Sequence, residues 1–381
     1  MKIGAPTEIA TAETRAALVP SVAADLIESG HEVIVSAGIG EQAGWMDSTY
    51  RDVGCTITET REEVFDQADI MVQVQALGAN PDETTAVYQS HQTVIGLLGP
   101  YSIGEQTRDL AEKEISAFAL ELIPRISRAQ SMDALSSMAS LGGYKSVLVA
   151  AEALPKLFPM QMTAAGTIQP ASVFVVGAGV AGLQAIATAQ RLGASVRAYD
   201  IRPEVKEEVE SLGASFVELE LETDDASDDE GHAREQDEDF YQKQRQMMNR
   251  VIAESDVVIT TAAIPGRPSP ELVTEEMIEG MEPGSVIVDL AAAGGGNCEP
   301  TEADERVTYE GVTIFGPTNL PATVSRHASQ LYANNVGNFL NHILTDEGLS
   351  IDTSDDIVDA TLLTHAGEIR NPHIDDETEE E

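Results

Sequence analysis

A polar segment at residues 125–138 concentrates side chains that could do chemistry: two cations, an amide, a carboxylate and a hydroxyl. Gln130, Asp133 and Ser136 recur at intervals of three residues, so they fall on one face of a helix. Arg125 lies just upstream of them. We therefore predict that these four polar side chains converge on one side.

A second interpretation of the same segment is an ordinary helix start. Ser131 would cap the helix, and Asp133 would favour the positive N-terminal end of the helix dipole. Arg125 and Arg128 would then be solvated. The residue types alone leave both interpretations open.

The stretch VFVVGAGVAGLQAIATAQRLGASVRAYD, residues 173–200, has the spacing of a dinucleotide-binding unit. Gly177 permits a tight turn after an apolar strand, Gly179 removes a side chain where a pyrophosphate approaches, and Gly182 lets the next helix pack on the strand. The N-terminus of that helix offers N–H groups and a positive dipole to phosphates. Asp200 ends the following strand, where it would accept hydrogen bonds from a ribose diol and favour NAD over NADP.

The residues assigned to cofactor binding in this unit are Gly177, Ala178, Gly179, Val180, Gly182, Asp200 and Arg202. Two further loops, TTAAIPGRP and AAAGGGN, follow apolar strands and so reach the edge of the sheet where ligands of open α/β sheets bind. They add the candidates Thr261, Ala262, Gly295 and Asn297. FAD is the competing ligand for the glycine motif, and plain turn chemistry is the competing explanation of the two loops.

The composition excludes several classes of protein. The 381 residues include 65 Asp and Glu against 22 Lys and Arg, a formal net charge of −43. Nucleic acid and anionic membranes are excluded as partners, because phosphate binding needs clustered cations. Such an acidic surface is tolerated in molar salt, where charges are screened, so we expect a halophilic, salt-accumulating cytosol.

We expect no metal and no membrane insertion. The seven histidines show no metal-ligand spacing, and Cys55 and Cys298 are too few and too far apart for a thiolate site or a disulfide framework. The sequence contains neither a signal peptide nor an apolar run long enough to span a bilayer. A cytoplasmic location is therefore expected.

Alternating apolar and helical segments predict two parallel α/β units in tandem. The expected strands of the first are MKIGAP, HEVIVSAG, ADIMVQVQ, TVIGLLG and ISAFALEL. Those of the second are ASVFVVGAG, SVRAYD, SFVELE, DVVITTAA, GSVIVDLAAAGG and VTIFGP. A long amphipathic helix, SQLYANNVGNFLNHIL, follows them and is expected to pack back on the first domain.

Two acidic segments interrupt this pattern. Residues 222–241 form an insertion that is either a solvated loop or a mobile flap over a site. The tail at residues 375–381 is expected to be disordered.

Four stretches resemble one family: RISRAQSMDALSS, MTAAGTIQPASVFVVGAGVAGLQAIATAQRLGA, TTAAIPGRPSPELVTEEM and GSVIVDLAAAGGGNCE. They look like the NAD(H)-binding subunit, domain I, of proton-translocating NAD(P)+ transhydrogenase, and more distantly like alanine dehydrogenase. The resemblance runs from about residue 1 to about residue 370. It implies two Rossmann-like parallel-sheet domains with the cofactor cleft between them, the first completed by the C-terminal segment. The expected domains are residues 1–135 with 328–381, and residues 136–327.

The resemblance also implies roles for the polar segment. Arg125, Asp133 and Ser136 would orient the nicotinamide and its ribose, while Gln130 would reach the NADP(H) held by a partner. The family has a mobile loop that closes over NAD(H) with a tyrosine. At that position this chain has His232, within the acidic insertion.

The related alanine dehydrogenase needs a general acid/base, because it moves a proton together with the hydride. Where that relative has its lysine and histidine at the substrate, this chain has Gln73 and Leu97, and neither residue can do that chemistry. Arg15 matches the arginine that holds the substrate carboxylate there, but transhydrogenase shares it. Transhydrogenation needs only two nicotinamides in near-attack geometry, which suits a site without a His or Lys base.

The resemblance thus implies an enzyme that transfers hydride between NAD(H) on this chain and NADP(H) on a partner beta subunit. The resemblance further implies a homodimer, a small membrane-spanning subunit, coupling to proton translocation in those separate subunits, and a peripheral location at the cytoplasmic face of the membrane. Two alternatives stay open: a stand-alone amino-acid dehydrogenase of the alanine type, and a non-catalytic NAD(H)-sensing module.

Overall fold

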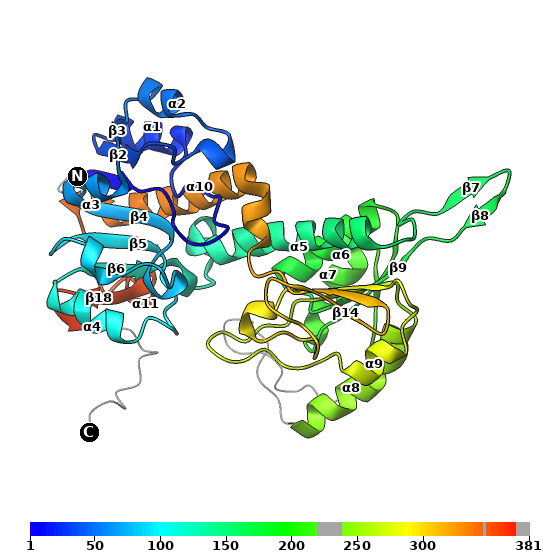
Figure 1. Ribbon diagram of the computed structural model, residues 1–381. Helices are drawn as coiled ribbons and strands as arrows, with labels where there is room; N and C mark the ends of the chain where they lie inside the picture. Colours follow the sequence, from blue (N-terminus) through cyan, green and yellow to red (C-terminus); the bar gives the residue numbers. More distant parts are fainter. Residues whose placement is uncertain (219–237, 346–347, 371–381) are drawn as a thin grey trace. The chain divides into compact units, whose positions relative to one another are not determined.

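The structure is a computed structural model that describes residues 1–218, 238–345 and 348–370. Most of the acidic insertion, including His232, and the tail at residues 375–381 lie outside the described residues. The chain divides into two compact units (Figure 1). The first unit comprises Met1–Met138 and Pro321–Glu381, and the second unit comprises Ala139–Leu320.

An eight-stranded sheet forms the centre of the first unit, in the order β19-β18-β6-β5-β4-β1-β2-β3. Strands β1 to β6 are parallel, whereas β18 and β19 are antiparallel. The strands are β1 (Lys2–Ala5), β2 (Glu32–Ser36), β3 (Thr56–Thr58), β4 (Ile70–Gln75), β5 (Thr93–Leu97), β6 (Ser116–Ala119), β18 (Leu362–His365) and β19 (Glu368–Ile369). The helices are α1 (Pro20–Glu28), α2 (Asp47–Asp52), α3 (Arg61–Gln67), α4 (Glu105–Glu112), α10 (Ser325–Ile343) and α11 (Asp356–Thr361), and β16 (Leu344–Thr345) and β17 (Gly348–Leu349) form a short hairpin.

The C-terminal segment completes this first unit. Helix α10 buries Tyr332, Val336 and Phe339 entirely, and the Phe339 ring packs edge-on against Phe118 of β6 at 5.3 Å. Strand β18 extends the sheet by pairing with β6. These elements supply apolar cover and a paired edge that residues 1–138 lack by themselves.

A seven-stranded sheet forms the centre of the second unit, in the order β11-β10-β9-β12-β13-β15-β14, and only β14 is antiparallel. The strands are β9 (Ser172–Val176), β10 (Ser195–Tyr199), β11 (Ser215–Phe216), β12 (Val257–Thr260), β13 (Val286–Asp289), β14 (Arg306–Tyr309) and β15 (Val312–Phe315). The helices are α5 (Ala134–Ala153), which begins in the first unit, α6 (Val180–Arg191), α7 (Lys206–Ser211), α8 (Glu238–Ala253) and α9 (Glu275–Glu279). The predicted fold class, two parallel-sheet Rossmann-like α/β domains, is confirmed.

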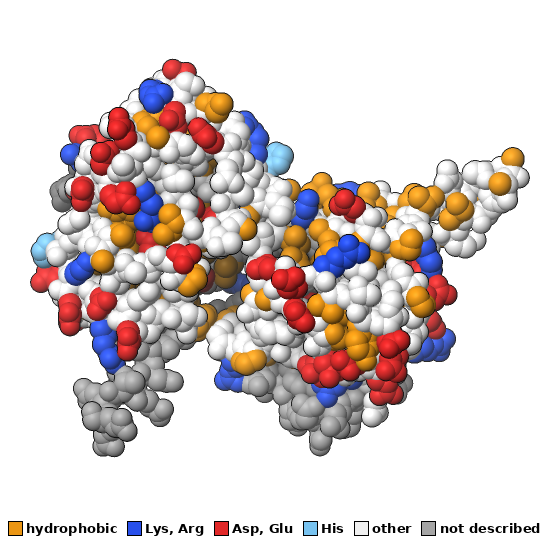
Figure 2. Space-filling view, viewed as in Figure 1, with side chains coloured by type: hydrophobic (Ala, Val, Ile, Leu, Met, Phe, Trp, Pro, Cys, Tyr) orange, Lys and Arg blue, Asp and Glu red, His pale blue; other side chains and the backbone are white. Residues whose placement is uncertain are grey.

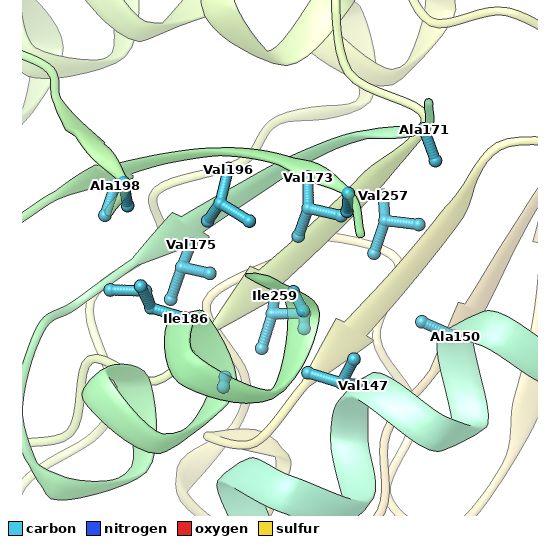
Figure 3. Packing of buried hydrophobic residues seen from close by; sticks show 14 of the residues in the cluster. Val147, Ala150, Ala171, Val173, Val175, Ile186, Val196, Ala198, Val257 and Ile259 are labelled. Atoms are coloured by element: carbon cyan, nitrogen blue, oxygen red, sulfur yellow. The ribbon is translucent and has the colours of Figure 1, made fainter. Parts of the chain in front are cut away.

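Both faces of the second sheet are buried, which explains why its strands are continuously apolar. Val173 and Val175 of β9 face one core, together with Val147 of α5 and Ile186 of α6 (Figure 3). The alternate residues of the same strand, Phe174 and Val176, face a second core. Successive residues of β9 thus pack alternately into two different cores, one on each face of the sheet.

Several elements have no counterpart in the prediction. Strands β3 and β14 are short and partly exposed, so no apolar run marks them. A β-hairpin, β7 (Gln161–Thr163) and β8 (Gly166–Ile168), projects from the second unit, and every residue of its strands is exposed (Figure 1). A sequence pattern that depends on burial cannot reveal such strands.

Candidate functional site

The glycine loop between β9 and α6 has two positions where only glycine fits. Gly177 has φ +97°, and a Cβ placed there would lie 2.4 Å from Oγ1 of Thr261. A Cβ on Gly182 would lie 1.9 Å from the carbonyl oxygen of Gly177. These two glycines are therefore required by the turn and by the packing of α6 on β9.

Gly179 differs from both. It precedes α6 with an ordinary φ of −75°, and a Cβ placed on it would meet no atom within 4 Å. The space above Gly179 is open at the N-terminal end of a twelve-residue helix with no acidic residue in its first turn. Free N–H groups and a positive dipole at that end suit a phosphate. The loop thus fits the pyrophosphate of a dinucleotide.

Asp200 follows β10, and its carboxylate is hydrogen-bonded to the backbone of the glycine loop. The N–H of Ala178 donates to its Oδ2 at 2.6 Å. Arg202 forms a bidentate ion pair with the same carboxylate, at 2.9 Å from Nε and 3.0 Å from Nη2, and its backbone N–H donates to Oδ1 at 2.9 Å. The hydrogen bond from Arg202 to this carboxylate raises the pKa of the guanidinium. A ribose diol at Asp200 would share the carboxylate with Arg202 and the loop.

The loops after β12 and β13 form one hydrogen-bonded assembly. The buried Asn297 donates from Nδ2 to the carbonyl oxygens of Ala262 and Pro270, both at 2.8 Å, and its Oδ1 accepts the N–H of Ala262 at 2.9 Å. Its side chain therefore joins the two loops. Gly295 has φ +99° and open space above it.

Asp289, which the sequence reasoning missed, is the centre of this assembly. It is fully buried at the end of β13 and accepts five hydrogen bonds. The donors are the N–H groups of Ala291, Asn297 and Cys298 and the hydroxyls of Thr260 and Thr301. Asp289 could have been found from the sequence, because it is a carboxylate at the end of an otherwise apolar strand, VIVD. The structure thus brings all the predicted cofactor residues of the second unit to one edge of its sheet.

In the polar segment, the residue that caps α5 is Asp133. Its Oδ1 accepts the N–H of Ser136 at 2.8 Å, and its Oδ2 accepts the hydroxyl of Ser136 at 2.5 Å. The expectation that Ser131 caps the helix is wrong. A 3₁₀ helix, η5 (Ser127–Met132), precedes α5, and the carbonyl of Ser131 instead accepts hydrogen bonds from α10.

Arg125 and Gln130 are exposed, and in residues 1–218, 238–345 and 348–370 neither side chain has a hydrogen-bond or ion-pair partner. They are free to contact a ligand. Arg128, in contrast, is not simply solvated, because its guanidinium pairs with Asp355 at 2.6 Å and Asp356 at 3.5 Å.

Arg15 and Gln73 each belong to a buried polar cluster of the first unit. Nε and Nη2 of Arg15 donate to the two oxygens of Glu13, at 2.7 and 2.5 Å. Gln73 is fully buried, donates to Glu83 at 3.1 Å and accepts the hydroxyl of Tyr88 at 2.6 Å. These side chains satisfy one another and include no lysine or histidine.

Two further observations concern the described residues as a whole. They contain no group of three or more His, Cys, Asp or Glu side chains placed to hold a metal ion. None of their helices combines the length and the apolar character needed to cross a bilayer.

Two family models match the sequence: "Alanine dehydrogenase/PNT, N-terminal domain" at residues 4–142, and "Alanine dehydrogenase/PNT, C-terminal domain" at residues 146–372. In Rickettsia prowazekii, the protein named as the first part of NAD(P) transhydrogenase subunit alpha is 44% identical over 377 residues, which cover 97% of this chain and 96% of that protein. The corresponding protein of Rhodospirillum rubrum is 43% identical over 379 residues, covering 98% and 99%.

The crystal structure of transhydrogenase from Sinorhizobium meliloti matches with a TM-score of 0.86 at 41% identity, covering 97% of this chain and all of that one. The resemblance found in the sequence is confirmed by these matches. Both the domain models and the relatives extend over nearly the whole chain, which therefore belongs to the alanine dehydrogenase/PNT family.

Proposed function

We propose that this chain is the NAD(H)-binding component of an NAD(P) transhydrogenase and exchanges hydride with NADP(H) on a partner subunit. The observation that carries the proposal is the open space above Gly179, because this glycine of the loop, unlike Gly177 and Gly182, has no nearby protein atom that excludes a side chain. Relatives with 43–44% identity that are named for NAD(P) transhydrogenase subunit alpha support the same assignment.

In this proposal, NAD(H) supplies or accepts the hydride through its nicotinamide. The N–H groups at the start of α6 bind the pyrophosphate, and Asp200 with Arg202 binds the adenosine ribose. Arg125 and Gln130 contribute exposed donors, while Asp133 and Ser136 orient the nicotinamide and its ribose.

No side chain in this set needs to take a proton. Direct transfer between two nicotinamides moves a hydride alone, so near-attack positioning supplies the catalysis. Asp133 suits that task because Ser136 fixes both of its oxygens.

The network at Gln73 argues against the alanine dehydrogenase alternative. That chemistry requires a general acid/base at the substrate, whereas Gln73 is held between Glu83 and Tyr88 and Leu97 is apolar. The guanidinium of Arg15 is already paired with Glu13, which weakens its capacity to bind a substrate carboxylate.

The partners we propose are an NADP(H)-binding beta subunit and a small membrane-spanning subunit, with proton translocation through those chains. This chain would lie peripherally at the cytoplasmic face of the membrane. The relatives from Rickettsia prowazekii and Rhodospirillum rubrum are each named as one part of a subunit, which supports the existence of further parts.

We also propose a homodimer, and the projecting hairpin supports it. Residues 160–169 carry no charge in a chain of net charge −43. Met160, Met162 and Ile168 are 55%, 77% and 45% exposed, and hydrophobic side chains are visible along the hairpin in Figure 2. A lone two-stranded hairpin is at best marginally stable in water, and two strongly acidic copies approach each other most easily through uncharged surfaces.

The test is hydride transfer from NADH to an NADP+ analogue in molar KCl, with the chain alone, with an NADP(H)-binding transhydrogenase domain added, and with L-alanine and NAD+ as a control. Transfer only in the mixture is expected. Formation of NADH from alanine by the lone chain would establish the dehydrogenase instead.

Asp133→Asn separates catalysis from mere sensing of NAD(H). The asparagine oxygen can still cap α5, so NADH affinity should change little while hydride transfer collapses. Transfer at the wild-type rate would remove the role assigned to Asp133.

A further inference from the structure

The segment that carries Gln130 is attached to the C-terminal part of the first unit by two sets of polar contacts. In the first set, Nδ2 of Asn335 and Nδ2 of Asn338, both on α10, donate to the carbonyl oxygen of Ser131 at 2.9 and 3.1 Å. In the second set, Arg128 pairs with Asp355 and Asp356 at the start of α11. The two sets lie on η5, immediately before Asp133.

The partner side of the ion pair is itself fixed. Asp355 caps α11 by accepting the N–H groups of Ile357 and Val358 at 2.9 and 3.2 Å. Its Oδ1 also contacts Nε2 of His342 at 3.1 Å. Arg128 therefore binds to an anchor that α10 and α11 hold in place.

Helix η5 packs against α10 but has few buried side chains. Only Ala129 and Met132 of its six residues are buried, and short 3₁₀ helices have poor hydrogen-bond geometry. The orientation of Gln130 thus depends on the polar contacts to α10 and α11.

One feature of Asn335 indicates more than structural support. The residue is 5% exposed, and its buried Oδ1 has no hydrogen-bond partner among the described residues. Leaving a buried acceptor unpaired is unfavourable, and Asn338 already donates to the same carbonyl. One hydrogen bond to the carbonyl oxygen of Ser131 would be enough to attach η5 to α10. The second donor, from Asn335, additionally fixes the orientation of η5 relative to α10.

We propose that Arg128, Asp355, Asn335 and Asn338 are positioning residues for hydride transfer, which hold η5 so that Gln130 and Asp133 meet the nicotinamide in register. The inference rests on the proposed function. Because the four residues belong to the first unit and the glycine loop belongs to the second, their loss should slow the transfer step and leave NADH binding nearly unchanged. Misplacement of a reacting group by about 1 Å can cost on the order of a hundredfold in rate.

The variants are chosen to separate position from stability. Arg128→Ala removes both ion pairs, Arg128→Lys keeps the charge, and Asp355→Asn removes the charge while retaining an oxygen to cap α11. Arg370→Ala is the matched control, because Arg370 pairs with Asp359 of α11 at 2.7 Å and, within the described residues, forms no hydrogen bond or ion pair with η5. Asn335→Ala with Asn338→Ala tests the uncharged contacts.

The readouts are single-turnover hydride transfer to an NADP+ analogue on the partner domain, the dissociation constant for NADH, and amide hydrogen exchange over residues 127–133. We expect Arg128→Ala and Asp355→Asn each to slow transfer by about fivefold near 0.1 M KCl, with faster exchange in η5. The effects should be non-additive when Arg128→Ala and Asp355→Asn are combined, since both single variants remove the ion pair between Arg128 and Asp355. Arg128→Lys should recover most of the rate, and Arg370→Ala should match wild type.

Salt gives an independent check. In molar KCl the loss caused by Arg128→Ala should shrink through screening, whereas the loss in the double asparagine variant should persist. Wild-type transfer by Arg128→Ala and by the double asparagine variant would overturn the positioning role and leave the proposed function intact. Loss of NADH affinity in proportion to rate would also overturn it. Absence of transfer by the wild-type chain with its partner domain would overturn the proposed function itself.

Discussion

Gly179→Ala should leave the fold intact and abolish tight binding of NADH. The added methyl group meets no atom within 4 Å, and φ of −75° suits alanine. Alanine restricts the unfolded chain, which stabilises by about 0.4–1 kcal/mol, and it is a poorer N-cap than glycine by up to about 1 kcal/mol. The two effects nearly cancel, so the free energy of unfolding should change by less than about 1 kcal/mol.

Binding should respond very differently. A Cβ in the space above Gly179 pushes the pyrophosphate away from the N–H groups of α6. Losing one or two charge-assisted hydrogen bonds costs about 3 kcal/mol, which corresponds to roughly a hundredfold rise in the dissociation constant. The assay is NADH fluorescence titration of the variant beside thermal unfolding of the same preparation.

Two matched glycines serve as controls. Gly142, inside α5, also has no atom within 4 Å of an added Cβ, so Gly142→Ala should bind NADH normally. Gly182→Ala should instead unfold easily, because its Cβ would overlap the carbonyl of Gly177. If Gly179→Ala folded normally and bound NADH with wild-type affinity, the pyrophosphate would not pass over this loop, and the assignment of the site would fail.

Four other predictions concern the core, the hairpin and the charged surface. Asp289→Ala leaves three buried N–H groups and two hydroxyls without their acceptor and should lower the free energy of unfolding by about 3 kcal/mol or more, measured by urea denaturation; a change below about 1 kcal/mol would contradict the central role of this carboxylate. Met162→Glu should convert the proposed dimer to a monomer in light scattering, with Met46→Glu, at a similarly exposed methionine of the first unit, as the matched control, and a persistent dimer would place the interface elsewhere. Burial raises the pKa of Glu121 from 4.5 to about 7, so the folded state holds this proton more tightly and stability falls as pH rises from about 4.5 to about 7; over that interval the melting temperature of Glu121→Gln should rise relative to wild type, and parallel curves would refute this. The net charge of −43 predicts a melting temperature that rises with KCl, and a flat salt dependence would remove the halophilic expectation.

The parallel strands were predictable because both faces of each sheet are covered, so β4, β9 and β12 read as uninterrupted apolar runs. The glycine loop was predictable because Gly177 and Gly182 are demanded by local geometry. The hairpin of β7 and β8 was not, since its strands are exposed throughout.

The features of the site that could not be predicted depend on contacts between residues far apart in the sequence. Asp289 gains its importance from Thr260 and Thr301, and Arg128 gains its partner from Asp355, 227 residues away. Asp133 and Ser131 are equally good caps by residue type. Asp133 is the cap because Ser131 lies inside the 3₁₀ helix that precedes α5, and no local sequence pattern specifies this helix.

The return of the chain to the first unit has a consequence for its biosynthesis. Residues emerge from the ribosome in order, so the second unit is fully synthesised once residue 320 has appeared. At that moment β6 still lacks β18 along its edge, and the core above it lacks Phe339. A nascent chain should therefore contain a complete nucleotide-binding sheet while the sheet of the first unit still has an unpaired edge at β6. An unpaired edge can pair with other chains, so the protein most needs protection from aggregation during this interval.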